Sequence, residues 1–233
     1  MPLAKQRYTT PLLHSLTRAD FSMLNTASPV IYLASASPRR GELLAQIGVA
    51  FRLLVPHPGE PEVDESVQCN EHADAYVVRL ARAKAAAGEA RRQLRHLPSG
   101  LIIAADTTVV IDTTILGKPH DHADAARMLR LLSGREHRVL TAVAVQRATH
   151  MEVALSDSRV RFCTLNDDQI NQYIISGEAN DKAGAYGIQG RAAQFIQHLS
   201  GSYSGVMGLP LFETTQLIQH VCAYRATKET VHE

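Results

Sequence analysis

The residues best suited to chemistry form a short run of serines and arginines, Ser35-Ala36-Ser37-Pro38-Arg39-Arg40, directly after an apolar run. Ser37 is a candidate N-cap and Pro38 suits a first helical turn, so the stretch predicts a strand that ends in a turn and opens a helix. The first amides of a helix lack intrahelical partners and lie at the positive end of its dipole. With two hydroxyls and two guanidinium groups beside them, they would form a site for an anion, most naturally a phosphate group. A capped helix with solvated arginines is the alternative.

An isolated carboxylate, Asp106, follows the apolar run 101–105 and precedes a second apolar run, 109–111. An acid between two buried segments is costly unless it binds something. Asp106 is therefore predicted to lie at the end of a strand, where open α/β sheets place their sites, as a metal ligand or general base. The alternative is an aspartate that only caps a turn.

Two lysines are candidates for the same site. Lys84 follows Leu80 by four residues in a segment of high helix propensity, so it projects beside the apolar stripe of that helix. From there it either extends to solvent or reaches into a site. Lys118 lies on a turn next to Gly117 and close in sequence to Asp106. The segment is not a P-loop, because the upstream glycine and the Ser or Thr that follows the lysine in a P-loop are missing.

Acidic residues crowd the loop that follows Val55. Four of them, the last being Glu65, lie among prolines between residues 56 and 65. A loop cannot bury such charges without partners, so these acids are expected to face solvent or a cation. The run His120-Asp121-His122 is a weaker metal candidate, because adjacent loop residues rarely converge on one ion. Asp121 is instead expected to cap the helix that follows it.

A glycine-rich segment, Gly184-Ala185-Tyr186-Gly187-Ile188-Gln189-Gly190, carries glycines at a spacing of three. Glycine lets a backbone approach a ligand closely. Gln189 offers an amide donor and an amide acceptor, the pair needed to read the edge of a nucleobase. The spacing equally allows an irregular connection between strands with a buried glutamine.

The elements that must position these residues follow from hydrophobic periodicity and turn signals. Helices are predicted over residues 38–47, 71–97, 123–132, 167–175 and 211–224. Strands are predicted over the apolar run before Ser35 and over residues 51–55, 101–105, 138–145, 153–162 and 194–199. The strands over 138–145 and 153–162 form a long hairpin. Gly88 is placed among the residues that end the second helix, and residues 201–204 are expected to form a turn.

Length and composition limit the classes of protein to which this chain can belong. The 233 residues are enough for one large domain or two lobes with a shared core. Lys and Arg number 24 against 23 Asp and Glu, a balance that argues against a dedicated nucleic-acid binder. The 3 cysteines are scattered and lack metal-ligand spacing, so reduced thiols in a reducing compartment, the cytoplasm, are expected. No run is long enough to predict a membrane-spanning helix.

The first 28 residues differ from the rest. They are rich in Ser and Thr and carry Lys5, Arg7 and Arg18 with a single acid, Asp20. That composition resembles an organelle transit peptide, and a disordered tail is the alternative. The predicted division is an extension over 1–28, one domain over 29–225 and a tail over 226–233.

Six motifs, taken in order, resemble the Maf family of nucleoside triphosphate pyrophosphatases. They are LASASPRRGELL (33–44), AADT (104–107), LGKP (116–119), LSGREH (132–137), DKAGAYGIQG (181–190) and GLPL (208–211). The resemblance covers about residues 30–224. The extension and the loop rich in Pro and Glu at 56–63 depart from the family pattern, so the resemblance implies nothing about them.

The resemblance implies an α/β fold like that of inosine triphosphatase, with a mixed twisted sheet flanked by helices and a cleft between two lobes. It implies hydrolysis of a nucleoside triphosphate to the monophosphate and pyrophosphate with Mg²⁺ or Mn²⁺, and a homodimer. The form of residues 181–190 resembles the branch that acts on dTTP and UTP. A 7-methyl-GTP pyrophosphatase and a nucleotide-sensing regulator of cell division are the alternatives.

The resemblance also assigns roles to the candidate residues. Asp106 corresponds to the proton acceptor that activates a water, and Glu65 is expected to hold the metal together with Asp106. The phosphates would be bound by Ser35, Ser37, Arg40, Lys84 and Lys118. Arg39, Thr107 and Gln189 match positions linked to the choice of substrate, and the amide of Gln189 suits the shared edge of uracil and thymine.

Overall fold

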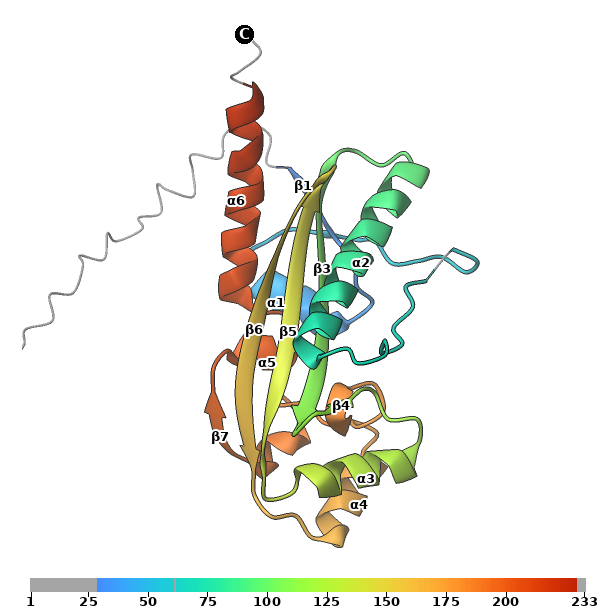
Figure 1. The fold of residues 1–233 in the computed structure, drawn as a ribbon, viewed down its shortest axis with the longest axis vertical. Helices are drawn as coiled ribbons and strands as arrows, with labels where there is room; N and C mark the ends of the chain where they lie inside the picture. The colour runs from blue at the N-terminus through green and yellow to red at the C-terminus, as the bar shows by residue number, and fades with distance from the viewer. Residues whose placement is uncertain (1–28, 61, 230–233) are drawn as a thin grey trace, which may run out of the picture.

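A twisted mixed sheet of seven strands forms the centre of the molecule (Figure 1). The computed structural model describes residues 29–60 and 62–229. The strands are β1 (Val30–Leu33), β2 (Arg52–Leu53), β3 (Gly100–Ile111), β4 (Thr114–Leu116), β5 (Glu136–Arg147), β6 (His150–Phe162) and β7 (Ile196–Ser200). The helices are α1 (Pro38–Gln46), α2 (Ala73–Leu94), α3 (His122–Leu132), α4 (Asp167–Ile175), α5 (Tyr203–Met207) and α6 (Leu211–Glu229). Two 3₁₀ helices, η1 (Ala183–Ala185) and η2 (Arg191–Phe195), complete the described elements.

The strand order is β2-β1-β3-β5-β6-β7, and β4 pairs with β3. Strand β1 is parallel to both β2 and β3, whereas the other pairs are antiparallel. The parallel strands β1 and β3 are joined through α1, β2 and α2, as parallel pairing requires a long crossover. The mixed twisted sheet expected from the family resemblance is thus confirmed.

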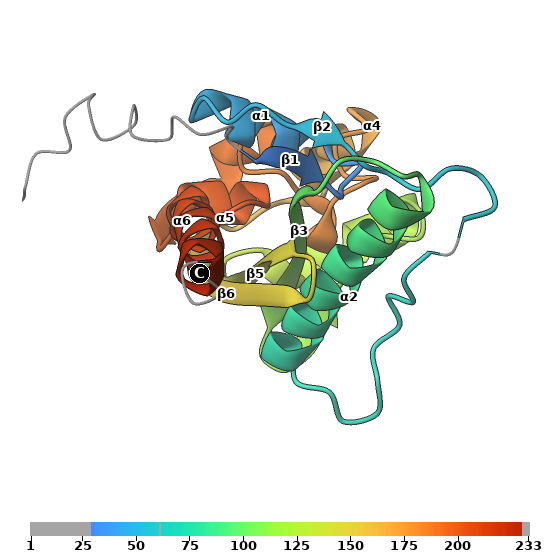
Figure 2. The same cartoon turned by 90° about the horizontal axis from the view of Figure 1, so that it is seen from above.

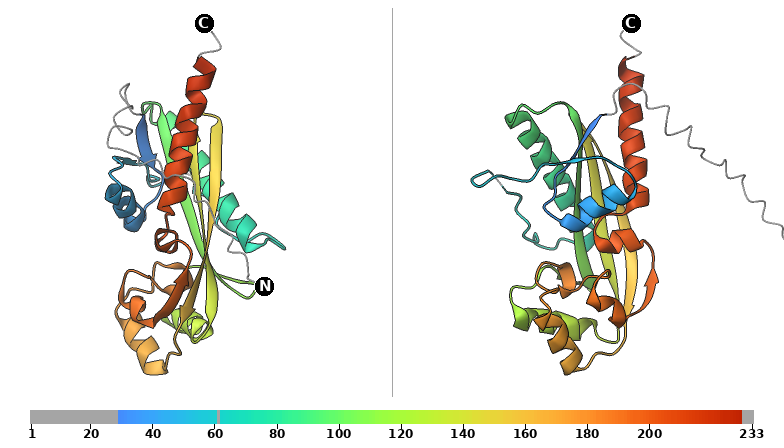
Figure 3. Two further views of the ribbon diagram at one scale, coloured as in Figure 1. Left: turned by 90° about the vertical axis from the view of Figure 1, so that its left-hand side faces the viewer. Right: turned by 180° about the vertical axis from the view of Figure 1, so that it is seen from behind.

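The three long strands β3, β5 and β6 run from one end of the molecule to the other, and helices cover the two ends differently. Around the upper part in Figure 1, α2 covers one face of the sheet, and α1 and α6 lie on the other (Figure 2). At the opposite end, α3, α4 and the segments around η1 and η2 form a second lobe, which Figure 3 shows from two further sides. The long strands therefore join two lobes.

Side-chain alternation along β3 builds a core on each face of the first lobe. Ala104 packs with Val77 and Ala81 of α2, and all three side chains are buried. The next residue, Ala105, points to the opposite face and joins a core that contains Leu44 of α1 and Leu217 of α6. Because successive side chains of a strand point to opposite faces, one strand holds both helical layers in register.

Strand β3 corrects the prediction for Asp106. The strand runs without a break from Gly100 to Ile111, so Asp106 lies in its middle and not at its end. Asp106 pairs in register with Ala142 of β5, and the ladder continues on both sides of it. The adjoining residues Thr107 and Thr108 are β-branched and suit a strand. The three polar residues 106–108 therefore interrupt the hydrophobic pattern of the sequence but not the strand itself.

Helix α2 also differs from its prediction, because Gly88 lies inside it and does not help to end it. A Cβ at Gly88 would lie 2.7 Å from Ile102 Cγ2 and 2.9 Å from Ala34 Cβ. The glycine therefore allows α2 to pack closely on the sheet. Elsewhere, β7 begins only at Ile196, residues 203–207 form the short helix α5, and α6 extends to Glu229.

Several expectations concern features outside these elements. The extension over residues 1–28, and with it organelle targeting, lies outside the described residues, as does the end of the predicted tail. Within residues 29–60 and 62–229, no helix combines the length and the apolar character that crossing a membrane requires. The three cysteines, Cys69, Cys163 and Cys222, are all free.

His137 is buried in the core of the second lobe. Its Nε2 lies 2.8 Å from the hydroxyl oxygen of Tyr186, and its ring meets the ring of Phe162 edge to face. Burial lowers the pKa of His137 to about 4, from an ordinary value of 6.5. The histidine is therefore neutral at neutral pH, and it supports a tyrosine that lines the cavity described below.

The free energy of unfolding is expected to fall as the pH drops from 6.5 to about 4. In this window the unfolded chain carries a proton on His137 that the folded protein does not, so acid favours unfolding. At the pH of the folded-state pKa, protonation of the unfolded chain lowers the free energy of unfolding by about 3 kcal/mol relative to neutral pH. Urea denaturation at several pH values measures this loss.

His137→Phe is the matched variant, because it keeps an aromatic ring and cannot titrate. Its stability is expected to lose this part of the pH dependence. If the free energy of unfolding changed equally with pH between 6.5 and 4.5 in both proteins, the assignment to His137 would be wrong.

Two carboxylates, Glu60 and Glu71, affect stability only at lower pH. Hydrogen bonds from the His57 amide to Glu60 and from Arg79 to Glu71 lower both pKa values to about 2, so their contribution is lost only below pH 4.5.

Candidate active site

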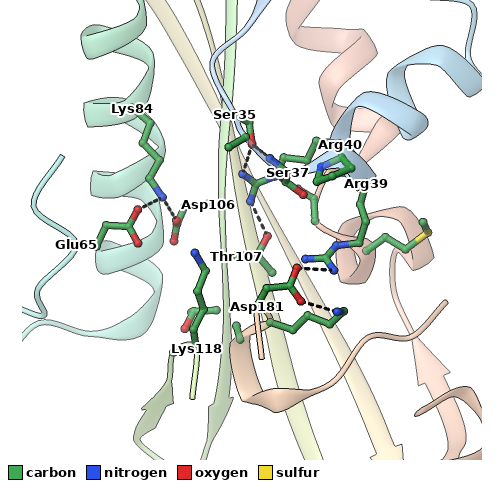
Figure 4. Close-up of a pocket in the computed structure, with 18 of the residues that line it drawn as sticks. Ser35, Ser37, Arg39, Arg40, Glu65, Lys84, Asp106, Thr107, Lys118 and Asp181 are labelled. Carbon is green, nitrogen blue, oxygen red and sulfur yellow. Dashed lines mark hydrogen bonds and ion pairs between the residues drawn. The ribbon is translucent and has the colours of Figure 1, made fainter. Parts of the chain in front are cut away.

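A cavity of about 570 Å³ lies between the two lobes, and β3 forms its floor (Figure 4). The first lobe contributes the residues before and at the start of α1, part of the loop before α2, and one side of α2. The second lobe contributes the turn after β4 and the segment around η1. All ten candidate residues line this cavity: Ser35, Ser37, Arg39, Arg40, Glu65, Lys84, Asp106, Thr107, Lys118 and Gln189.

Lys84 joins the two candidate metal-binding carboxylates. Its Nζ lies 2.6 Å from Glu65 Oε1 and 2.6 Å from Asp106 Oδ1. Of the two alternatives left open by the sequence, the lysine therefore reaches into the site. Burial raises the pKa of Glu65, but the hydrogen bond and charge of Lys84, with the charges of Lys118 and Arg40, outweigh this effect and lower it overall. Glu65 is therefore ionised at neutral pH.

The loop that carries Glu65 is tied to α2. The hydroxyl of Tyr76 donates to the carbonyl oxygen of Glu65 at 2.9 Å, and Arg79 Nη2 donates to the carbonyl oxygen of Ser66 at 2.9 Å. Another acid of the same loop, Glu60, is held by two cations, the guanidinium groups of Arg91 and Arg95. The expectation that these acids face solvent or a cation is met for Glu60 by arginine side chains distant in the sequence.

Arg40 connects three parts of the chain. Its Nε donates to the carbonyl oxygen of Gly208 at 2.8 Å, its Nη1 to Ser35 Oγ at 3.0 Å, and its Nη2 to Thr107 Oγ1 at 3.4 Å. Thr141 Oγ1 in turn donates to Thr107 Oγ1 at 3.0 Å. Arg40 therefore fixes the serine loop against β3 while it brings a positive charge to the cavity wall.

Ser37 occupies the N-cap position of α1, as predicted, but its side chain makes no capping hydrogen bond. Its backbone amide instead donates to Ser35 Oγ at 3.2 Å. Pro38 begins the helix, as expected for a residue without an amide hydrogen. The hydroxyl of Ser37 thus has no partner among the described residues and lies at the cavity wall.

Arg39 and Lys118 are the cations whose donors are least engaged by the protein. Arg39 Nη1 lies 3.5 Å from Asp181 Oδ2, which belongs to the second lobe. Lys118 has no hydrogen bond or ion pair with any residue in the described part of the chain, and it extends toward Asp106 in Figure 4. Its turn is held by a hydrogen bond from the Gly184 amide to the carbonyl oxygen of Gly117, at 3.0 Å.

Gln189 is exposed at the edge of the cavity, so the alternative of a buried glutamine is wrong. The segment before it folds back tightly at Gly184, whose φ is +69°. A Cβ there would lie 2.8 Å from Val109 Cγ2, so both the backbone angle and the packing require glycine. Gln189 follows this turn by five residues and lines the cavity together with the start of α1.

The sequence reasoning missed Thr108 and Asp181. Thr108 lines the cavity and is 2% exposed, and its hydroxyl has no partner among the described residues. It lies two residues after Asp106, so recognition of one continuous strand would have placed both on the same face. Asp181 is the first residue of the motif over 181–190, but its contact with Arg39 joins segments far apart in the sequence.

The donor set fits a hard divalent ion. Glu65 and Asp106 provide carboxylate oxygens, which Mg²⁺ and Mn²⁺ prefer, and the second oxygen of each has no partner among the described residues. No group of three or more His, Cys, Asp and Glu residues in the described ranges is arranged for a metal. An ion here would therefore also need water or phosphate ligands, as is usual for Mg²⁺.

Asp121 belongs to the weaker metal candidate over residues 120–122. Its side chain accepts a hydrogen bond from the Asp124 amide and caps α3, as predicted.

Comparison with known proteins shows the family of the chain. The family model described as Maf-like protein matches residues 30–221. The chain belongs to the Maf family. The match spans nearly the same residues as the resemblance drawn from the six motifs, which is thereby confirmed, and it includes every candidate residue of the cavity.

Three bacterial relatives of this Maf protein each carry the name dTTP/UTP pyrophosphatase. The relative from Aromatoleum aromaticum is 54% identical over 193 residues, which cover 81% of this chain and 94% of the relative. The one from Ralstonia nicotianae is 58% identical over 192 residues, covering 82% and 93%. The one from Dechloromonas aromatica is 50% identical over 194 residues, covering 82% and 96%.

Proposed function

We propose that this protein is a dTTP/UTP pyrophosphatase, which hydrolyses these nucleotides to the nucleoside monophosphate and pyrophosphate. The observation that carries the proposal is the meeting of Asp106, Glu65 and Lys84 on one wall of a cavity whose other walls hold Arg39 and Lys118. A carboxylate beside a group of cations suits attack by water on a triphosphate. The names of the relatives support the substrate.

Asp106 is proposed as the proton acceptor for the attacking water. Lys84 holds one carboxylate oxygen at 2.6 Å, so the other oxygen is oriented and available for the water. Glu65 and Asp106 together are proposed to hold Mg²⁺ or Mn²⁺, which when bound would lower the pKa of the water. Lys84 then has two roles, because it orients both carboxylates and adds positive charge beside the phosphates.

The cations of the cavity are proposed to bind the triphosphate and to stabilise charge on the departing pyrophosphate. Lys118 and Arg39 have free donors for phosphate oxygens. Arg40 is already bound to three protein oxygens, so it acts through its charge and by fixing the loop that carries Ser35 and Ser37. The first amides of α1, beside that loop, add donors at the positive end of a helix dipole.

Gln189 is proposed to read the base, with Arg39 and Thr107 contributing to the choice of substrate. Uracil and thymine present the same N–H and carbonyl edge to an amide, and they differ only in a 5-methyl group. Gln189→Ala is expected to lower kcat/KM for UTP and dTTP about tenfold relative to CTP, the effect of about one hydrogen bond. Binding of inorganic tripolyphosphate is expected to stay unchanged.

A panel of UTP, dTTP, CTP and 7-methyl-GTP tests both the function and this residue. Pyrophosphate release is measured with Mg²⁺, with Mn²⁺ and with excess EDTA. The proposal predicts preferred turnover of UTP and dTTP that EDTA abolishes. Preferred turnover of 7-methyl-GTP would identify the alternative activity instead. Relative rates that Gln189→Ala leaves unaltered would exclude the glutamine from base recognition.

Two further parts of the proposal rest on the family resemblance and on composition. We infer a homodimer from the resemblance, and a cytoplasmic location from the odd number and scattered positions of the 3 cysteines. Sedimentation of the purified full chain tests the first inference, and a monomer at micromolar concentration would contradict it. Fractionation of cells that express the full chain tests the second.

A further inference from the structure

A second charged network lies on the side of the cavity formed by the second lobe, and two of its members, Asp181 and Lys182, have no role in the proposed reaction. The carboxylate of Asp181 lies between two cations from different lobes: its Oδ2 is 3.5 Å from Arg39 Nη1, and its Oδ1 is 2.6 Å from Lys182 Nζ (Figure 4). Arg39 lies in the first turn of α1, whereas Lys182 directly precedes η1. Asp181 thus forms a bridge across the cavity.

Lys182 supports the loop that carries Gln189. Its Nζ also donates to the carbonyl oxygen of Glu178 at 2.6 Å, and its side chain is 15% exposed. A Cβ at Gly187 would lie 2.8 Å from Lys182 Cε, so the aliphatic stem of the lysine lies directly against the backbone at Gly187. The lysine bound to Asp181 therefore packs on the chain two residues before Gln189.

Glu178 holds the other side of the same loop. Its Oε2 accepts a hydrogen bond from the Arg191 amide at 2.8 Å. A Cβ at Gly190 would overlap the Glu178 carboxylate, so glycine is needed there for the loop to close on it. Gln189 consequently lies between two glycines, each packed against a side chain of this network.

We propose that Asp181 is a specificity-determining positioning residue, which ties Arg39 to Lys182 and thereby fixes the start of α1 relative to the loop of Gln189. The inference rests on the proposed function and extends it to a residue without an assigned role. Burial raises the pKa of Asp181, but the hydrogen bond and charge of Lys182, with the charge of Arg39, lower it overall, so the bridge is charged at neutral pH.

The bridge has two opposite effects on a nucleotide. By holding Arg39, Asp181 keeps the guanidinium at a fixed distance from the base-reading loop, which favours selectivity. The same carboxylate repels a polyphosphate and competes with it for Arg39, which weakens binding of the phosphates. Because the Asp181 side chain is 64% exposed, solvent screens both effects, and changes of about three- to tenfold are expected.

Asp181→Asn tests both the effect on selectivity and the effect on phosphate binding, since it removes the charge of the side chain and preserves its shape. The discrimination of UTP over CTP, measured as the ratio of kcat/KM values, is expected to fall about three- to tenfold. Calorimetric titration with inorganic tripolyphosphate in EDTA is expected to show tighter binding by a similar factor. If Asp181 served only folding, the variant would lower both the discrimination and the affinity for tripolyphosphate. Lower discrimination together with higher affinity therefore identifies the bridge.

Asp112→Asn is the matched control, because Asp112 is also an exposed aspartate paired with an arginine, Arg135, outside the cavity. It is expected to change neither quantity. Because Asp181 is proposed to act through Arg39, its effect on discrimination should disappear on an Arg39→Met background. An undiminished effect there, or any pattern in Asp181→Asn other than lower discrimination with tighter tripolyphosphate binding, would overturn the proposal.

Failure of the proposed function would give a different result. If the unaltered protein released no pyrophosphate from any nucleotide, that function would be wrong. The bridge would then be tested by calorimetric binding of UTP and CTP in EDTA. Equal discrimination by the unaltered protein and by Asp181→Asn in that titration would overturn the bridge as well.

Discussion

Asp106→Asn is expected to lower kcat for pyrophosphate release from UTP by about 10²- to 10⁴-fold, the usual contribution of a general base. Asparagine has nearly the same shape as aspartate, and its carbonyl oxygen can still accept the hydrogen bond from Lys84. The backbone at this position is held in the middle of β3 by pairing with Ala142. The variant should therefore fold normally and lose only the proton acceptor and metal ligand.

The measurement is steady-state release of pyrophosphate, with a thermal denaturation curve to verify folding. Asp112→Asn serves as the control, since it makes the same chemical change at the turn that follows the same strand. It is expected to retain full activity. A kcat for Asp106→Asn within threefold of the unaltered protein would exclude Asp106 as the proton acceptor.

Lys84→Met is expected to lower kcat/KM for UTP by about 10²- to 10³-fold. The ammonium group lies 2.6 Å from a carboxylate oxygen of Glu65 and 2.6 Å from one of Asp106. Its removal leaves two neighbouring carboxylates without their shared cation and takes one positive charge from the phosphates. Methionine keeps most of the aliphatic stem, so packing on α2 is preserved.

The pH profile provides a second measurement for this variant. Lys84 lowers the pKa of Glu65 through a hydrogen bond and its charge, so its loss raises that pKa. The acidic limb of kcat/KM is therefore expected to move to higher pH in Lys84→Met. Arg82→Met removes an exposed cation from the same helix and should change neither the rate nor the profile. An unshifted acidic limb in Lys84→Met would contradict the role given to the lysine.

Local sequence was enough to predict the start of α1 and the cap of α3. At both places, neighbouring residues provide the determining interactions: Pro38 opens α1, and Asp121 caps α3. Each feature depends on residues no more than about one helical turn apart. The long hairpin of β5 and β6 was predictable because two runs of alternating and β-branched residues follow each other closely in the sequence, and the strands pair around a short turn between Arg147 and His150.

Features that depend on distant partners were not predictable in this way. Asp106 lies in mid-strand because β5 continues the ladder beside it, and no residue near Asp106 in the sequence indicates that pairing. Gly88 looks like a helix terminator until its contact with Ile102 is known. Arg40 looked like a free phosphate ligand, although it bonds to Gly208, 168 residues away in the chain.

The candidate site shows the same division. The residues that line the cavity could be named from their types and motifs, but their partners could not. Nothing in the sequence shows that Lys84 contacts both Glu65 and Asp106, or that Asp181 holds Arg39 across the cavity. Lys84 meets both carboxylates because α2 packs on β3, whereas Asp181 reaches Arg39 because the long strands join the two lobes.

The products formed from UTP test the central claim most directly. The purified full chain is incubated with UTP and Mg²⁺ or Mn²⁺, and phosphorus NMR follows every phosphorus-containing species. The account predicts one pyrophosphate and one UMP for each UTP consumed, with neither orthophosphate nor UDP. Orthophosphate as the sole inorganic product would contradict it.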